Sequence, residues 1–425
     1  MANDEALRLT VLTGMLLNCS IPPYAKFDRK NYFYPDMPKN YQITQYDRPS
    51  TTTGYLDFEF AGGMSRVRIT RAHLEEDVAK NFHFDRTSGV DCNRAGVPLM
   101  EIVSEPDLTS ADMAYDYLNA LKEVLVYGGV SDCDMEKGMV RCDVNVSVRP
   151  KGQAELGAKI EIKNMNSFSG VRKALEYEIP RQLAAVKKGE KLIQSTRRWD
   201  DVASITSEMR TKEHAHDYRY FPEPDLMPFQ PAESWLEEVS KRVVELPLAR
   251  KQRFIRDYQL PISDAQTFVW DVPLGSYFES IARQTKNPKA AANWVINNLR
   301  AKLTESQTAI GDIKFKSDAI PELIELVDSG KISTKIAQEV FAEMFSGGES
   351  PLKIVEKKGL LQVSDLGELE NFCDQAIAAN PGPAADFKAG KAAALNFLKG
   401  QVMKLSKGKA NPALVGEILE RQLKA

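Results

Sequence analysis

The sequence predicts an α+β fold: antiparallel strands and helices in the first half of the chain and helices alone in the rest. In the first half, apolar and polar residues alternate over short segments, which is typical of half-buried strands. After about residue 232 this alternation stops, and apolar residues recur at the i, i+3, i+4 and i+7 positions of amphipathic helices. We therefore predict a sheet-containing domain over residues 1–232, a helical domain over 233–355 and a helical tail over 356–425.

The elements of the first half follow from local patterns. Residues 4–17 have apolar residues on one helical face, and the alternating segments 56–60 and 66–70 flank Gly62-Gly63 as a hairpin. Residues 110–127 predict a helix that ends at a glycine pair. A further helix follows Ser167, and we expect Pro180 to break it, because proline lacks the N–H that the helical ladder needs.

Two neighbouring strands carry the densest polar pattern in the chain. Residues 140–149 alternate strictly, and a second strand covers residues 159–163. One face of the pair would present Arg141, Asp143, Asn145, Lys159, Glu161 and Lys163. Such a face is either an ordinary solvated surface or a site for a polyphosphate and its metal ion.

A carboxylate lies inside an apolar run at Glu101, between Leu99-Met100 and Ile102-Val103. If the carboxylate is buried, it needs compensation by an ion pair, amide groups or a metal ion. Arg94 is a nearby candidate for an ion pair, so both the structural and the metal-binding interpretation stay open.

The only marked charge asymmetry lies in the tail, where no acidic residue occurs between Asp386 and Glu417. This pattern indicates either a solvated face or contact with a phosphate backbone. The lysines in question are Lys388, Lys391, Lys399, Lys404, Lys407 and Lys409.

Composition excludes several other classes of protein. The net charge of the 425-residue chain is −3, so any nucleic-acid contact must be local, and the five cysteines form no Cys-x-x-Cys pair. A disulfide framework and a zinc ribbon are therefore not expected, and a reducing cytoplasm fits best. No apolar run approaches the roughly 20 residues that span a bilayer. Glycine-rich phosphate loops are absent, so a nucleotide would be bound by acids and a metal on a sheet.

Several unusual segments, in order along the whole chain, resemble the B subunit of the aspartyl/glutamyl-tRNA amidotransferase. These segments are Lys26–Pro35, His73–Asp77, Leu99–Asp107, Gly129–Asp132, Arg141–Ser147, Lys163–Phe168, Asp217–Asp225 and Gly408–Pro412. The resemblance implies a cradle-shaped domain related to glutamine synthetase, followed by a helical domain and a tail that binds tRNA.

The resemblance also implies an activity. Such a ligase uses ATP and Mg²⁺ to phosphorylate the side-chain carboxylate of Glu-tRNA(Gln) or Asp-tRNA(Asn). Ammonia that a partner amidase, the A subunit, releases from glutamine then arrives through a channel and displaces the phosphate. A small C subunit ties the other two together.

Residue by residue, the resemblance implies roles for particular side chains. Glu76 and Glu101 match the magnesium-site acids, and Lys39 lies where a base would meet arriving ammonium. Asp143 and Glu161 are further candidates as metal ligands, while Arg141, Asn145 and Lys163 are expected to bind the ATP phosphates.

In one respect the sequence departs from this family. Family members begin with a segment that contains a Gly-Leu-Glu-Val-His-like strand, and this sequence begins after it. We therefore expect an incomplete metal site and an exposed sheet edge. There are two alternative functions. One is a glutamine-synthetase-type ligase that acts on a free small molecule; the other, which the missing segment supports, is a non-catalytic scaffold that binds tRNA.

Overall fold

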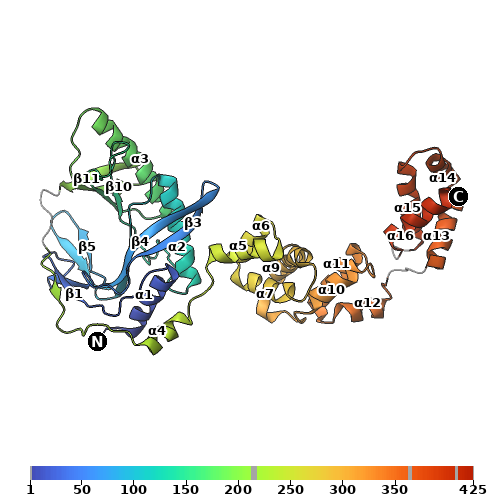
Figure 1. Cartoon of the computed structure of the whole chain (residues 1–425), viewed down its shortest axis with the longest axis horizontal. Helices are drawn as coiled ribbons and strands as arrows, with labels where there is room; N and C mark the ends of the chain where they lie inside the picture. The colour runs from blue at the N-terminus through green and yellow to red at the C-terminus, as the bar shows by residue number, and fades with distance from the viewer. Residues whose placement is uncertain (1, 212–217, 362–365, 407–409, 425) are drawn as a thin grey trace. The chain divides into compact units, whose positions relative to one another are not determined.

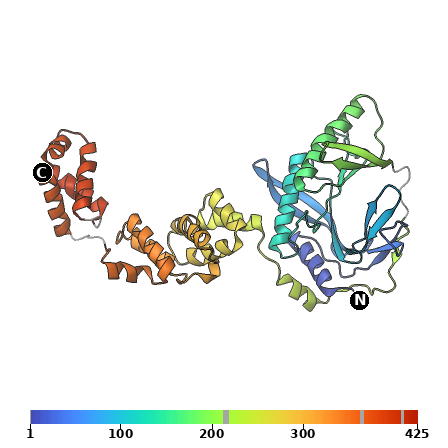
Figure 2. The ribbon, with the colours of Figure 1, turned by 180° about the vertical axis from the view of Figure 1, so that it is seen from behind.

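The computed structural model describes residues 2–211, 218–361, 366–406 and 410–424, and the chain divides into two compact units, Met1–Ala249 and Arg250–Ala425. The first unit combines strands with helices, and the second contains only helices among its described residues (Figures 1 and 2). The predicted α+β class, with a sheet-containing part followed by helices, is confirmed.

The first unit contains four small sheets and four helices among its described residues. Its elements are α1 Asp4–Leu16, β1 Asp28–Asn31, β2 Tyr41–Thr44, β3 Gly54–Phe60, β4 Gly63–Glu76, β5 Lys80–His83, β6 Ser88–Asp91, β7 Pro98–Ser104, α2 Ala111–Tyr127, β8 Val144–Val146, β9 Ile160–Lys163, α3 Phe168–Lys187, β10 Ser195–Asp200, β11 Ile205–Thr211, β12 Phe221–Pro222 and α4 Glu233–Ser240.

The central antiparallel sheet has the strand order β3-β4-β7. Its hairpin turns through Ala61 and Gly62, whose φ angles of 51° and 77° are the two positive values that a type I′ turn requires. The predicted hairpin is confirmed, with its turn one residue earlier than the glycine pair suggested. Helices α1 and α2 pack against this sheet (Figure 1), and their apolar stripes bury Leu12, Leu16 and Tyr117 against Phe58.

A second sheet has the order β11-β10-β9-β8 and is covered by α3, which contacts both β11 and β8. Strand β8 is much shorter than the predicted strand over residues 140–149. It pairs with β9 only along Val144–Val146, because β9 itself is four residues long. Without a partner strand, the rest of the alternating segment forms no ladder.

Helix α3 runs without a break from Phe168 to Lys187, so the predicted interruption at Pro180 is wrong. The helix packs along α2 and β11, and its buried Glu178 carboxylate accepts hydrogen bonds from Arg181, Gln182 and Thr206. These tertiary contacts outweigh the local cost of one proline.

Helix α4 belongs to the first unit, whereas the sequence placed residues 233–240 in the helical domain. Val239 is buried in the core that α1 and α2 share, and the Trp235 indole donates a hydrogen bond to Asp4 at 3.0 Å. The first compact unit therefore extends to Ala249.

The second unit is built from α5 Pro247–Tyr258, α6 Ile262–Trp270, α7 Val272–Ala282, α8 Pro288–Asn293, the π-helix η1 Trp294–Leu299, α9 Arg300–Ser306, the 3₁₀ turn η2 Ile310–Asp312, α10 Ala319–Asp328, α11 Thr334–Gly347, α12 Pro351–Lys358, α13 Leu366–Ala379, α14 Pro381–Lys388, α15 Ala393–Leu405 and α16 Pro412–Lys424. One apolar core gathers residues between Phe254 and Val355, and a separate core gathers residues between Leu369 and Leu423. None of the described helices is long and apolar enough to cross a membrane.

Candidate functional site

Strands β4 and β7 bring a histidine and two carboxylates together. Antiparallel pairing sets His73 directly opposite Glu101, and the two-residue period of β4 puts Glu75 on the same face as His73. His73 Nε2 lies 3.2 Å from Glu75 Oε1 and 3.2 Å from Glu101 Oε2. One ligand atom from each of the three residues lies within 4.8 Å of the others. Side-chain exposure rises from 1% at His73 to 52% at Glu101, so the cluster opens to solvent on one side.

The Glu75 carboxylate is held in its charged form. Burial would raise its pKa, but hydrogen bonds from His73 and Thr44 outweigh burial and lower the pKa below its ordinary value. The Thr44 hydroxyl donates to Glu75 Oε1 at 2.6 Å, and the Gln42 amide donates to Oε2 at 3.2 Å. Two side chains of strand β2 therefore fix the Glu75 carboxylate.

The His73 ring is buried and only partly satisfied. Its Nε2 faces two carboxylates at once, while its buried Nδ1 has no hydrogen-bond partner among the described residues. One imidazole proton cannot serve two carboxylates equally well. A divalent cation among the same three groups would satisfy both carboxylates.

The donor set fits a magnesium ion. Mg²⁺ is usually bound by one or two protein carboxylates, with waters and substrate phosphates completing its octahedron. Glu75 and Glu101 would supply the carboxylates, and the exposure of Glu101 leaves room for a phosphate. The imidazole of His73 also suits softer divalent ions such as Mn²⁺.

Glu76, which the sequence analysis named as a metal ligand, faces the other way along β4. Its Oε1 accepts a hydrogen bond from the Ile43 backbone N–H at 2.8 Å and forms an ion pair with Lys39 Nζ at 2.5 Å. The structure thus brings Glu101 together with Glu75 and pairs Glu76 with Lys39. A metal-binding role for Glu76 stays a prediction.

The sequence analysis did not identify His73 and Glu75 as site residues, although the alternation of faces along a strand could have indicated them. In a strand, adjacent residues point to opposite faces, so the alternation places Glu75, and not Glu76, on the same face as His73. The pairing of His73 with Glu101 was not available from local sequence, because β7 begins more than twenty residues after β4 ends.

The structure brings together part of the polar face that was predicted for residues 140–149 and 159–163. Lys163 Nζ lies 3.2 Å from Asp143 Oδ2 and 3.3 Å from Glu161 Oε1, and Asn145 sits directly opposite Glu161 in the β8–β9 ladder. Burial would lower the pKa of Lys163, but Asp143 and Glu161 outweigh it and raise the pKa. Lys163 is therefore charged at neutral pH and its charge is already shared between two acids.

Arg141 lies elsewhere in the first unit. Its Nη2 donates to Asp77 Oδ1 at 2.6 Å, and Arg94 donates to the other oxygen of the same carboxylate. The ion pair between Arg94 and Glu101 that the sequence left open does not form, because Arg94 is engaged by Asp77.

The tail lysines fall on two helices and a connecting segment. The sequence predicts an apolar stripe of Leu395, Leu398, Val402 and Leu405 in this part of the tail. Helix α15 buries the first three, whereas Leu405, the last residue of the helix, is exposed. Lys388, Lys391 and Lys404 are exposed, Lys399 is half-buried, and Lys407 and Lys409 lie outside the described residues. Lys391 forms an ion pair with Asp386 at 2.9 Å.

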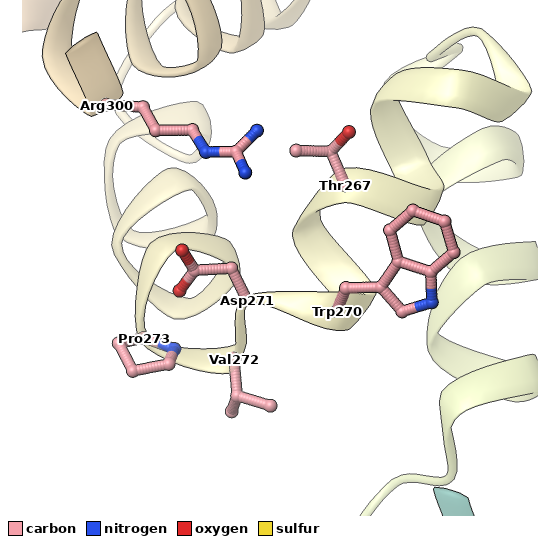
Figure 3. A pocket seen from close by; sticks show the side chains of 6 residues that line it. All are labelled: Thr267, Trp270, Asp271, Val272, Pro273 and Arg300. Carbon is pink, nitrogen blue, oxygen red and sulfur yellow. The ribbon is translucent and has the colours of Figure 1, made fainter. Parts of the chain in front are cut away.

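A separate cavity of about 520 Å³ lies in the second unit between α6, α7 and α9 (Figure 3). The guanidinium of Arg300 extends into it toward Thr267 and Asp271, and Trp270 lies at its side. None of the predicted site residues lines this cavity.

Comparison with known proteins places the whole chain in one family. Residues 1–237 match the GatB/GatE catalytic domain, and residues 276–423 match the GatB domain. The chain is 50% identical over 426 residues to the aspartyl/glutamyl-tRNA(Asn/Gln) amidotransferase B subunit of Carboxydothermus hydrogenoformans. Over 423 residues, it is 49% identical to the protein of the same name from Caldanaerobacter subterraneus subsp. tengcongensis and 48% identical to that from Persephonella marina.

Each of these alignments covers 99% of this chain and 89% of the relative. The matched catalytic domain includes the whole of the His73–Glu75–Glu101 cluster, and the matched GatB domain includes the described tail lysines. The resemblance drawn from the sequence is therefore confirmed, and the chain belongs to the family of aspartyl/glutamyl-tRNA(Asn/Gln) amidotransferase B subunits.

Proposed function

We propose that this protein activates the side-chain carboxylate of Glu-tRNA(Gln) or Asp-tRNA(Asn) with ATP and then converts it to the amide. The observation that carries the proposal is the cluster of His73, Glu75 and Glu101 on two paired strands of the family's catalytic domain. Two carboxylates, of which Glu101 is open to solvent, can hold a divalent cation while waters and phosphate oxygens complete its coordination.

In the first step, an oxygen of the substrate carboxylate attacks the γ-phosphorus of ATP. The bond between that phosphorus and the β,γ-bridging oxygen breaks, and ADP leaves with the electron pair. Catalysis of phosphoryl transfer depends chiefly on positioning and charge neutralisation. Glu75 and Glu101 would hold Mg²⁺, which supplies that neutralisation when bound. Lys163 and Arg141 would orient phosphate oxygens, and the Asn145 amide would donate to them.

In the second step, ammonia attacks the acyl phosphate, the carbon–oxygen bond to phosphate breaks, and inorganic phosphate leaves. Ammonium must lose a proton before it can attack. The ion pair of Lys39 and Glu76 lies at the end of β4, one residue beyond Glu75. We assign proton removal to this pair, with Glu76 accepting the proton and Lys39 stabilising the carboxylate.

The proposed assembly contains further proteins and a tRNA. The relatives are named as B subunits, which indicates a multi-subunit enzyme, and we infer that an amidase (the A subunit) and a small C subunit complete it. The enzyme would be a cytoplasmic ligase that forms a carbon–nitrogen bond with glutamine as the amido donor. The exposed tail lysines would contact tRNA phosphates.

The test uses the chain assembled with the A and C subunits and measures ADP release with Glu-tRNA(Gln). Replacing Glu101 by alanine should abolish ADP release and leave the Kd for tRNA within about twofold, because the Glu101 side chain is half-exposed and, among the described residues, its carboxylate pairs only with His73. Equal losses of ADP release and tRNA binding would assign Glu101 to folding instead.

The same assay separates the two alternative functions. A tRNA-binding scaffold would bind misacylated tRNA tightly without any ATP-dependent ADP release. A small-molecule ligase would release ADP with free glutamate or aspartate at the same rate as with the aminoacyl-tRNA. The proposal expects ADP release that requires misacylated tRNA.

A further inference from the structure

A buried aspartate holds two arginines just beyond the end of β4. Asp77 directly follows Glu76, and its side chain is only 4% exposed. One carboxylate oxygen, Oδ2, accepts a hydrogen bond from Arg94 Nε at 2.8 Å. The other, Oδ1, accepts from Arg141 Nη2 at 2.6 Å and from the Val78 backbone N–H at 2.9 Å. Asp77 is thus fully satisfied by groups from three separate segments.

The charges in this cluster do not balance. One carboxylate faces two guanidinium groups, which leaves one positive charge uncompensated among the groups in contact. A single arginine would have been enough to neutralise the buried carboxylate, and a second one adds repulsion between like charges. An anion bound to both arginines would offset that repulsion.

Both guanidinium groups remain available to a ligand. The side chain of Arg94 is 47% exposed and that of Arg141 is 59% exposed, although the carboxylate between them is buried. A guanidinium has five N–H donors. Among the described residues, Arg141 donates only to Asp77, and Arg94 donates only to Asp77 and to the Gly138 carbonyl. Several donors on each arginine therefore face solvent.

One loop fixes both arginines. The Gly138 carbonyl accepts from Arg94 Nη1, and Arg141 follows three residues later. Gly138 has a φ of +67°, and a Cβ added there would lie 3.0 Å from Arg94 Nη1. The loop therefore packs closely on Arg94 and at the same time presents Arg141 to Asp77.

In the sequence, members of this cluster lie next to both polar groups of the catalytic domain, the His73–Glu75–Glu101 cluster and the group around Lys163. Asp77 lies two residues after Glu75 of the carboxylate cluster, and Arg141 lies two residues before Asp143, the partner of Lys163. The carboxylates alone would repel a polyphosphate, so positive groups close by are a physical requirement of phosphoryl transfer at this site.

We propose that Arg94 and Arg141 together bind the phosphoryl group that passes from ATP to the substrate carboxylate, and that Asp77 positions the two arginines. This inference rests on the function proposed above. The guanidinium N–H groups donate to the non-bridging oxygens of that phosphoryl group, a geometry that arginine matches better than lysine does. No proton is transferred to or from the arginines, because they stay protonated throughout. Asp77 touches no reacting atom and acts only through the arginines.

The test compares lysine variants of the arginines with a matched control in the complex with the A and C subunits. R94K and R141K keep the charge but lose the planar fork. The control is R66K, because Arg66 on β4 also binds a carboxylate through two hydrogen bonds, to Asp57 on β3 at 2.6 and 2.8 Å. We expect R94K and R141K each to lower kcat for ADP release at least tenfold, with a smaller change in the KM for ATP and unchanged thermal midpoints. R66K should stay within twofold of the wild type.

The role of Asp77 is tested with the D77N variant, for which kcat and KM are determined separately. We expect D77N to lower kcat at least tenfold, and the double variant D77N/R141K to be no worse than the poorer single variant by more than about twofold, because both changes disrupt one unit. Multiplicative losses in the double variant would show that Asp77 acts independently of Arg141 and would overturn its positioning role.

A second measurement tests anion binding by Arg94 and Arg141 independently of catalysis. Binding of inorganic phosphate to the full chain is measured by calorimetry for the wild type, R94K, R141K and R66K. We expect at least a tenfold weaker Kd in the first two variants and no change in the control. Wild-type phosphate affinity and wild-type kcat in both lysine variants would overturn the inference. If the wild-type complex released no ADP with misacylated tRNA while phosphate binding still depended on both arginines, the proposed function would fail and the anion site would stand.

Discussion

The two units bury different kinds of residue. Among the described residues, every buried acid lies in the first unit, namely Asp28, Asp77, Glu178 and Glu223, together with the buried His73. In the second unit the core is aliphatic and aromatic, and its buried polar residues are Arg250, Lys251 and Ser406. A buried charge costs free energy unless it is paired, so a fold keeps such groups where a function requires them or where they fix a particular geometry. The contrast in buried acids agrees with the proposal that the carboxylate chemistry belongs to the first unit.

Glu178 in the first unit and Glu322 in the second unit have pKa shifts of opposite sign. Burial would raise the pKa of Glu178, but hydrogen bonds from Arg181, Thr206 and Gln182 lower it. In the second unit, burial raises the pKa of Glu322, and the neighbouring Asp318 and Glu325 raise it further. The surroundings of Glu178 therefore stabilise its charged form, whereas the surroundings of Glu322 disfavour its charged form.

The largest expected effect tests the apolar core of the second unit. Phe278 is fully buried, stacks on Phe268 with ring centroids 4.3 Å apart, and contacts Phe254 edge-on. Phe278→Ala should lower the free energy of unfolding of the second unit by about 4 kcal/mol, the usual cost of such a cavity. Hydrogen exchange of the amides of each unit measures this separately. Equal loss of protection in the first unit would contradict the separation of the two units.

The next largest effect compares the loss of a buried charge, at Glu178, with the loss of a partly buried charge, at Glu322. Glu178→Gln should destabilise the first unit by about 3 kcal/mol, because Arg181 and Arg197 lose their shared carboxylate. Glu322→Gln should leave the second unit as stable as before or slightly more stable at pH 7, because burial and acidic neighbours already disfavour the charge. Urea titrations monitored by hydrogen exchange compare the two variants. A similar loss of stability in both variants would contradict the expected difference between the two carboxylates.

The pH dependence of the two variants should have opposite signs. A lowered pKa means that Glu178 contributes stability above its ordinary pKa of about 4.5, and that the contribution is lost as pH falls through the folded-state value. The raised pKa of Glu322 favours folding below about 4.5, and this advantage is lost as pH rises through the folded-state value. The cost of Glu178→Gln should therefore shrink between pH 6 and pH 3.5, whereas Glu322→Gln should show its benefit only at the higher pH. Parallel profiles would contradict the assignment.

The smallest expected effect concerns the surface of the second unit. The exposed lysines Lys388, Lys391 and Lys404 are proposed to contact tRNA phosphates. Replacing all three by alanine should reduce the slope of log K against log salt concentration by about 2 to 3. Lys357→Ala, at an exposed lysine of α12 that pairs with Glu349, is the control and should leave the slope unchanged. A slope that is the same in the triple variant and the wild type would remove the tail lysines from the tRNA interface.

Local pattern was enough to predict most of the fold. The β3–β4 hairpin, helix α2 and the buried stripe of α15 follow from periodicity and turn residues, because in each case neighbours in sequence decide the structure. Prediction failed where distant segments decide. Pro180 stays helical because α2 and β11 hold α3 in place, and the segment around β8 is a strand only where β9 reaches it.

The site was predicted in part, for the same reason. Glu101 was identifiable as a carboxylate within an apolar run, but its partners depend on the register of β4 and β7, which sets it opposite His73. That register places Glu75 on the face that carries the cluster, whereas Glu76 forms an ion pair with Lys39. Likewise, the two arginines on Asp77 come from segments more than forty residues apart, so no local pattern connects them.

The most direct test of the central claim is the binding of Mn²⁺, as a paramagnetic substitute for Mg²⁺, to the full chain in the presence of ATP. The claim is that the face of β4 carrying His73 and Glu75, together with Glu101, holds the metal. We predict that Glu75→Gln weakens Mn²⁺ binding at least tenfold, whereas Glu76→Gln leaves it within about twofold of the wild type. The reverse order, with Glu76→Gln losing the ion and Glu75→Gln retaining it, would contradict the claim.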